Sequence, residues 1–224
     1  MNKKILVSVM VIALAGALVG GGIYAYFSDT ETSEGSTFTA GTLNLVPSTS
    51  GTGPAGKYTV TEGGDGVNGK VVFTTLAPED SGSITWELEN DGDLDGTLTM
   101  ASDVIFDENG SNEPEDAVAG NNGGGDGDLD EYMGVRLERD GTYILGDASH
   151  YVPFSDLEAV LDAESESLAA SDTLTYVLEW EIASDVMGAG ADGEFGTADD
   201  VDEDDNIIQS DKATLDITFT LTQA

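Results

Sequence analysis

Apolar and polar residues alternate along most of the chain with a period of two. The clearest run extends from Thr173 to Ile182, where large apolar side chains occupy every second position and Thr or Glu mostly lie between them. A half-buried β-strand has this period, because successive side chains point to opposite faces of a sheet. Further runs that we predict to be strands are Thr37–Leu45, Val71–Thr75, Ile84–Glu89, Thr97–Met100, Met133–Leu137, Tyr143–Leu145 and Thr214–Leu221.

About eight strands with one apolar face need a second sheet to cover that face. The pattern therefore predicts an all-β fold, a jelly-roll β-sandwich. We expect Trp86 and Trp180 to lie in its core, since both occupy the apolar face of a predicted strand. Asp140-Gly141 lies between two such runs, which is typical of a β-hairpin turn. Loops rich in Asp, Gly and Asn at 63–69, 107–130 and 187–206 are predicted to be surface excursions of one domain.

One short stretch predicts a helix. Ser155-Asp156-Leu157-Glu158 has the form of a capping box, in which a Ser side chain and the Glu three residues later bond each other's backbone amides. Leu157, Val160 and Leu161 then supply an apolar stripe at helical spacing. We predict a helix over Asp156–Ala163.

The N-terminus has the character of a membrane-directed segment. Lys3 and Lys4 precede an apolar run from Ile5 to Phe27, which is longer than the roughly 20 residues needed to cross a bilayer. A cleaved signal peptide and a retained anchor are both compatible with this run. Ala25 offers a small residue before a cut, although position −3 is Ile23. We predict a signal peptide over 1–25, cleaved after Ala25, and membrane contact through that segment alone.

The charge of the chain limits its partners. The formal net charge is −37, from 44 acidic residues against 7 Lys and Arg. Nucleic acids and anionic lipids require basic patches, so neither is expected to bind the bulk surface. Such a surface is tolerated in strong salt, where the screening length falls from about 10 Å to about 3 Å. Adaptation to salt and the holding of divalent cations are both consistent with it.

An open sandwich must protect its edge strands from uncontrolled pairing. One solution is to accept an extended strand from a neighbouring copy. The segment 26–40, a free terminus after cleavage, has the aromatic and Thr residues that favour an extended strand. It either serves as this donor or folds back as the chain's own first strand. The residues that we expect to form the donor are Tyr26, Phe27, Ser28, Asp29, Thr30, Thr32 and Phe38.

Three stretches of the chain resemble the TasA/camelysin family. They are "GGGIYAYFSDTETSEGSTFTAGTLNL" at 20–45, "LAPEDSGSITWELENDGDLDGTLTM" at 76–100, and the closing strands within 171–224. The second stretch resembles two of the family's patterns, L-x-P-G-D-S at 76–81 and N-x-G-x-x-x-G-x-L at 90–98. In the first pattern, Glu79 stands where the family often has Gly. The resemblance implies a jelly roll over 41–224, removal of the signal by a dedicated signal peptidase, and polymers in which each N-terminal strand completes the next subunit's sheet. Bacterial relatives form secreted matrix fibres and archaeal relatives form bundling pili.

Acidic clusters suggest calcium as the one candidate cofactor. Asp91 to Gly96 follows the first half of an EF-hand loop, but Ser102 replaces the Glu of the twelfth position and the flanks are predicted strands. The stretch from Gly190 to Asn206 is denser in acids. Calcium needs about six to eight oxygen ligands, and a solvated acidic loop is the alternative. The candidate ligands are Asp91, Asp93, Asp95, Asp192, Glu194, Asp199, Asp200 and Asp202.

Catalytic patterns are absent from the sequence. There is no Cys, and His150 is the single histidine, whereas a zinc protease of the H-E-x-x-H type needs two. No G-x-S-x-G occurs. We therefore predict no enzyme. We predict a secreted structural subunit that polymerises with its own copies by strand donation into extracellular filaments or bundling pili, which serve a biofilm matrix and cell–cell contact. The alternative is a monomeric calcium- or ligand-binding surface module that an uncleaved segment anchors to the membrane.

Overall fold

The structure is a computed structural model that describes residues 41–62, 68–108, 127–202, 206–208 and 211–224, together with Lys3 and Met10. The predicted signal segment 1–25, apart from Lys3 and Met10, therefore lies outside the described residues, as do its cleavage site at Ala25 and the donor segment 26–40. Residues 41–224 form one compact unit. Within the described residues, no helix combines the length and the apolar character needed to span a bilayer.

The first sheet is antiparallel and has the strand order β1-β4-β10-β6-β7, with the short β8 pairing with β6. Its centre is formed by β4 and β10, which pair from Thr173 opposite Glu89 to Glu181 opposite Ser81. The strands are β1 (Leu45–Thr52), β4 (Ser81–Asn90), β10 (Thr173–Glu181), β6 (Gly134–Arg139), β7 (Thr142–Leu145) and β8 (Val152–Pro153).

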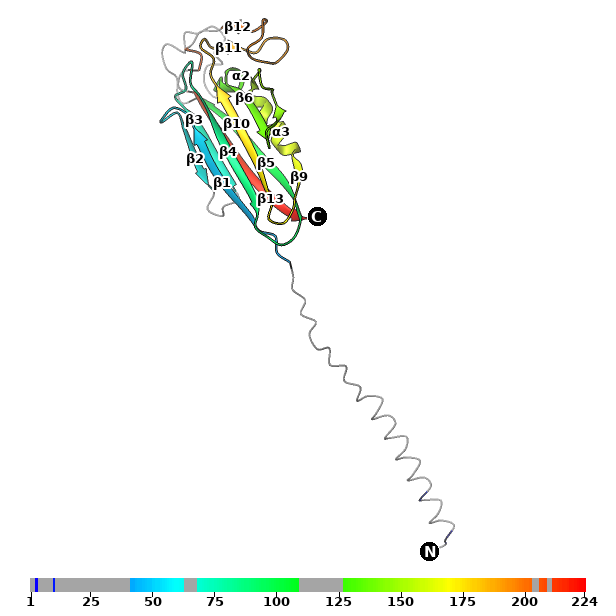
Figure 1. Ribbon diagram of the computed structural model, residues 1–224. Coiled ribbons are helices and arrows are strands. Elements are labelled where there is room, and N and C mark those ends of the chain that lie inside the picture. The colour runs from blue at the N-terminus through cyan, green and yellow to red at the C-terminus, as the bar shows by residue number, and fades with distance from the viewer. Residues whose placement is uncertain are drawn as a thin grey trace. The chain divides into compact units, whose positions relative to one another are not determined.

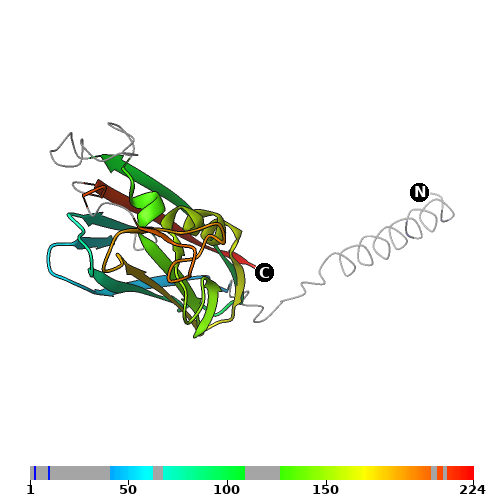
Figure 2. The same cartoon turned by 90° about the horizontal axis from the view of Figure 1, so that it is seen from above.

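The second sheet is also antiparallel and has the order β2-β3-β13-β5-β9. Its strands are β2 (Tyr58–Glu62), β3 (Asn68–Thr74), β13 (Asp211–Gln223), β5 (Gly96–Glu108) and β9 (Ser165–Leu168). The two sheets face each other (Figures 1 and 2). Aromatic rings pack between the two sheets. The ring centroid of Trp86 in β4 lies 6.4 Å from that of Phe219 in β13, and the centroid of Trp180 in β10 lies 5.3 Å from that of Phe73 in β3. The predicted all-β architecture is confirmed, while the jelly-roll connectivity stays a prediction.

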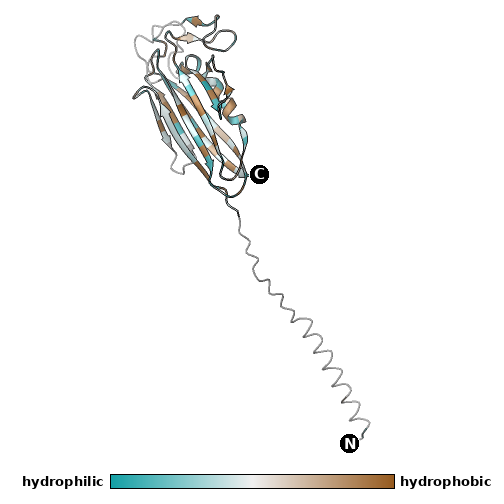
Figure 3. Ribbon diagram, viewed as in Figure 1, coloured by the Kyte–Doolittle hydropathy of each residue, from teal (hydrophilic) through white to brown (hydrophobic). Residues whose placement is uncertain are grey.

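The alternation read from the sequence becomes the inner and outer faces of these sheets. Figure 3 shows hydrophobic and hydrophilic bands alternating along the strands. In β10, Tyr176, Leu178 and Trp180 are at most 1% exposed. Trp86 is also 1% exposed, so both tryptophans belong to the core, as predicted. The hairpin at Asp140-Gly141 is confirmed as well, because it joins β6 to β7.

The helix is confirmed but its predicted cap is wrong. A 3₁₀ turn over Phe154–Asp156 (η2) leads into α3, Leu157–Ala163, and Asp156 is the N-cap without a side-chain bond. The Ser155 hydroxyl instead donates to the carbonyl oxygen of Asp130, 3.2 Å away. Glu158 accepts a hydrogen bond from the amide of Val104 at 3.4 Å. The two partners of the expected capping box thus fasten the helix to its neighbours.

The strand predicted over Thr37–Leu45 is wrong for its described part. Residues 41–44 have no strand conformation, and β1 begins at Leu45 and continues to Thr52. The backbone of residues 41–44 bonds to the turn after β4 and not to a neighbouring strand. The loop predicted over 187–206 contains a small hairpin of β11 (Met187–Gly188) and β12 (Val201–Asp202). The loop predicted over 107–130 likewise loses its ends to β5 and to the helix α2 (Leu129–Tyr132).

Candidate functional site

Polar residues gather at the two opposite ends of the sandwich. One end, which we call the connector end, carries residues 41–44, the turn between β4 and β5, and the C-terminus. Here the amide of Ala224 donates to the carbonyl of Asp95 at 3.4 Å. The other end, which we call the loop end, carries α2 and the hairpin β11–β12 (Figure 1). The predicted calcium ligands divide between these ends.

The three aspartates of the connector end do not face a common point. Asp91 accepts from the Asn44 side chain at 3.4 Å. Asp93 accepts from the amide of Thr42, and also from its hydroxyl at 3.3 Å. Asp95 accepts from the amide of Ala170 at 3.0 Å, on the connection between β9 and β10. The hydrogen bond from the Thr42 amide is the main cause that lowers the pKa of the Asp93 carboxyl. The partners of these carboxylates are therefore groups of the chain itself.

Asn90 joins several segments of the connector end, and the sequence motifs for catalytic and metal sites did not indicate it. Its side chain is fully buried. The side-chain amide donates to the carbonyls of Leu94, Leu168 and Ala169 at 2.8, 3.2 and 3.2 Å, and its oxygen accepts from the amide of Gly92 at 3.1 Å. A signal was present, because Asn90 and Gly92 open the N-x-G-x-x-x-G-x-L pattern quoted above.

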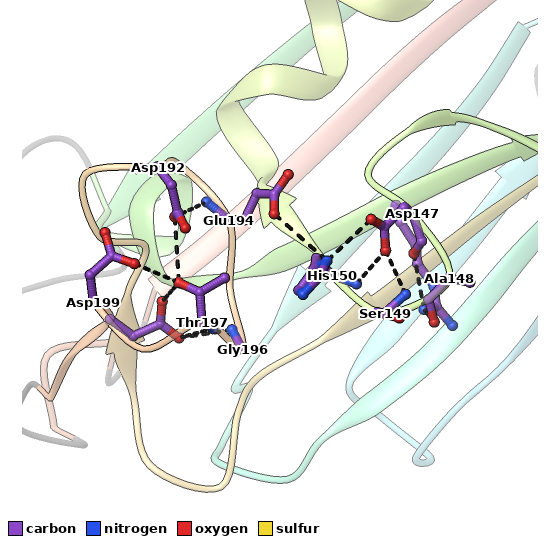
Figure 4. A network of polar contacts seen from close by, with 11 residues as sticks. Asp147, Ala148, Ser149, His150, Asp192, Glu194, Gly196, Thr197 and Asp199 are labelled. Carbon is purple, nitrogen blue, oxygen red and sulfur yellow. Dashed lines mark hydrogen bonds and ion pairs between the residues drawn. The ribbon is translucent and has the colours of Figure 1, made fainter.

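The loop end brings three of the predicted ligands together around one hydroxyl. The Oγ1 of Thr197 lies 2.8 Å from Asp199 Oδ1, 3.0 Å from Asp200 Oδ1 and 3.4 Å from Asp192 Oδ1 (Figure 4). Backbone amides complete the arrangement: Ala191 donates to Asp199 at 2.8 Å. The bond from Thr197 is the main cause that lowers the pKa of Asp199.

Glu194 turns away from these carboxylates and toward His150. His150 Nδ1 lies 3.1 Å from Asp147 Oδ2 and 3.6 Å from Glu194 Oε2 (Figure 4). The hydrogen bond to Asp147 is the main cause that raises the pKa of His150, and Glu194 adds to it. Beside this pair the amide of Phe195 donates to the carbonyl of Tyr151 at 2.8 Å. The acidic loop is thereby attached to the sandwich, while Asp202, in the exposed strand β12, faces solvent.

The positively charged side chains of the sandwich all lie in ion pairs with carboxylates. Only five Lys and Arg residues lie beyond residue 40, and each forms an ion pair. The pairs are Lys57–Asp80, Lys70–Asp216, Arg136–Glu179, Arg139–Glu164 and Lys212–Asp107. Arg136 also lies over the rings of Tyr143 and Tyr151 at 5.4 and 4.5 Å. The surface that remains for partners is therefore strongly anionic.

The longest open edge of the sandwich is β1. It pairs with β4 over all eight residues, and none of the other described strands pairs with its opposite side. The other edge strands are β2, with five residues, and β7 and β9, with four each. Val46 of β1 is a large apolar side chain that is 41% exposed. This edge has the length and character of an acceptor for another strand.

The N-terminal residues match a known family. Residues 1–51 match the model of a family described as Camelysin metallo-endopeptidase. No curated protein and no solved structure matches the chain. The description implies a metal, but over the described ranges no group of three or more His, Cys, Asp or Glu side chains could hold one. We therefore derive no peptidase step, and calcium binding stays a prediction. Camelysin is related to TasA, so the family resemblance read from the sequence is confirmed over residues 1–51, and it indicates a surface or extracellular protein.

Proposed function

We propose that the protein is a secreted structural subunit that polymerises into extracellular filaments by strand donation. After cleavage behind Ala25, the segment 26–40 of one copy pairs with the sheet of the next copy. A signal peptidase is the partner that releases the segment, and copies of the same chain are the partners in the filament. The family match over residues 1–51 and the open edge of β1 support this proposal.

The open edge of β1 is the observation that carries the proposal. Pro47 has no amide hydrogen, and proline is tolerated in an edge strand where that position faces away from the sheet. The backbone groups of Leu45, Pro47, Thr49 and Gly51 then point outward, since they share one side of the strand. An incoming strand gains about 0.5–1.5 kcal/mol for each main-chain hydrogen bond. At Pro47 the incoming strand can donate to a carbonyl oxygen but receives no hydrogen bond in return. This difference favours one register of pairing over others.

Electron microscopy of the secreted protein tests the proposal. We expect filaments from the natural sequence and dispersed particles from the double variant T30P/T32P, because proline interrupts a paired strand. The matched control T30S/T32S keeps both amides and should still form filaments. Deletion of 26–35 should abolish them. Filaments that persist in both the proline variant and the deletion would contradict strand donation.

A membrane-anchored monomer that binds calcium or another ligand is the second candidate. The convergence of Asp192, Asp199 and Asp200 on Thr197 is the observation in its favour. Mass spectrometry of the N-terminus separates the two candidates. A start at Tyr26 supports the filament subunit, whereas a start at Met1 in dispersed protein supports the anchored module.

A further inference from the structure

The turn between β4 and β5 holds the residues that lead into the sandwich. We call Gly41–Asn44 the connector and Asp91–Gly96 the acidic turn. The amide of Asp91 donates to the carbonyl of Asn44 at 2.8 Å. The amides of Asp93 and Leu94 both donate to the carbonyl of Thr42, at 3.0 and 3.2 Å. The backbone of the connector is thus bonded at two residues before β1 begins.

Side chains of the same turn add to this backbone contact. Asp93 accepts from both the amide and the hydroxyl of Thr42, so this one carboxylate binds a connector residue twice. Asp91 accepts from the side chain of Asn44 at 3.4 Å. Hydrogen bonds to an ionised acceptor are stronger than those between neutral groups. The carboxylates that resemble a cation loop in the sequence therefore bind the connector in the structure.

Close approach of the two segments depends on glycine. A Cβ atom on Gly92 would overlap the carbonyl oxygen of Thr42 and lie 2.9 Å from the amide nitrogen of Asn44. Both are backbone atoms, which cannot rotate away as a side chain can. A Cβ on Gly41 would likewise overlap the side chain of Leu94. Any larger residue at position 92 would force the connector and the acidic turn apart.

The acidic turn is itself fixed to the rest of the sandwich. The side chain of Asn90 bonds to the Leu94 carbonyl and the Gly92 amide of the turn. The amide of Asn90 donates to the carbonyl of Asp172 at 2.9 Å, and its carbonyl accepts from Ser171 at 2.8 Å. Asp95 binds Ala170 in the same connection. The turn is therefore bonded to the sandwich at several residues, while the side chains of Asp91, Asp93 and Asp95 stay exposed.

We propose that the acidic turn is a clamp that binds the connector, with Asp93 and Gly92 as its positioning residues, and so fixes the path of residues 41–44 into β1. The biological role of this clamp rests on the proposed function: in a filament joined by N-terminal segments, the load passes through residues 41–44 into β4.

Hydrogen exchange on the dispersed full chain in detergent tests the clamp without any need for filaments. We expect D93A to raise the exchange rate of the Thr42 amide by about tenfold, as is typical for loss of a charge-assisted hydrogen bond. D93N retains an acceptor oxygen and should restore most of the protection. D95A removes the same charge from the same turn but breaks a bond to Ala170, so Thr42 should exchange as in the natural protein.

A distance measurement distinguishes positioning from a general loss of stability. The chain has no Cys, so L43C on the connector and D103C on β5 introduce two unique sites for spin labels. We expect a narrow distance distribution in the natural background and a broad one in Gly92→Ala. Gly188→Ala is the matched control, because its Cβ would meet Tyr132 at an ordinary 3.4 Å. Equal widths in the natural and Gly92→Ala backgrounds, or unchanged Thr42 exchange in D93A, would overturn the clamp. Absence of filaments would contradict the proposed function but leave these two readouts intact.

Discussion

Replacement of Asn90 by alanine is expected to destabilise the sandwich strongly. The side-chain nitrogen has two hydrogens for three carbonyls within 3.2 Å, so at most two donated bonds form at once, and the oxygen accepts one more. A net 0.5–1.5 kcal/mol per bond, with buried groups left unsatisfied, gives a loss of about 2–4 kcal/mol in the free energy of unfolding. For a domain of this size the melting temperature should fall by about 5–15 °C.

Urea unfolding in high salt measures this loss directly. The slope of the free energy against urea concentration should stay unchanged, because the same surface is exposed on unfolding. Asn44→Ala is the control: its side chain is exposed and makes a single contact at 3.4 Å, so the change should stay within about 0.5 kcal/mol. If Asn90→Ala also stayed within that range, the assigned role of Asn90 in the connector end would be refuted.

Three further predictions concern other parts of the sandwich. Glu79 has φ of 70°, a conformation that favours glycine, so Glu79→Gly should raise stability by about 1 kcal/mol in urea unfolding, whereas a loss would show that the side chain compensates. The pKa of His150, measured by NMR on the only imidazole, should exceed 6.5 and fall more in D147N than in E194Q. Because that pKa is raised, the stabilisation from the ion pairs of His150 with Asp147 and Glu194 is fully present below pH 6.5 and is lost as pH rises through the folded-state value. A measured value at or below 6.5 would contradict the geometry. Calcium at about 100 times its dissociation constant should add about 2.7 kcal/mol of stability in the natural protein but not in D199N/D200N; identical melting with calcium and with a chelator would remove calcium from the account.

Alternation alone predicted the core strands well, because each of them has one face in a shared core. The run from Thr173 to Ile182 became β10, and the pattern around Trp86 became β4. The edge strands β2 and β9 were not predicted because both are short: β2 has only Tyr58 and Val60 as apolar residues, and β9 has only Leu168. One or two apolar residues are too few to establish a period of two.

The contacts of the connector end could not be predicted from the sequence, because they join residues that are distant along the chain. Asp91, Asp93 and Asp95 follow cation-loop spacing, yet their partners Asn44, Thr42 and Ala170 are far away in the sequence. Spacing within one segment carries no information on such partners. The predicted capping box at Ser155 is wrong for the same reason: the Ser155 hydroxyl donates to the carbonyl of Asp130, which is 25 residues away, and not to the helix. Position 79 shows the converse: the turn keeps a conformation suited to glycine although the residue is Glu.

Hydrogen exchange of β1 in dispersed protein and in filaments is the measurement that tests strand donation most directly. The edge from Leu45 to Thr52 pairs with β4 on one side, and no described strand covers the other. If the neighbour's N-terminal segment pairs there, the outward amides of Leu45 and Gly51 should become strongly protected on polymerisation, while those of β9 stay as they were. Equal exchange of β1 in dispersed protein and in filaments would contradict the assignment of this edge as the acceptor.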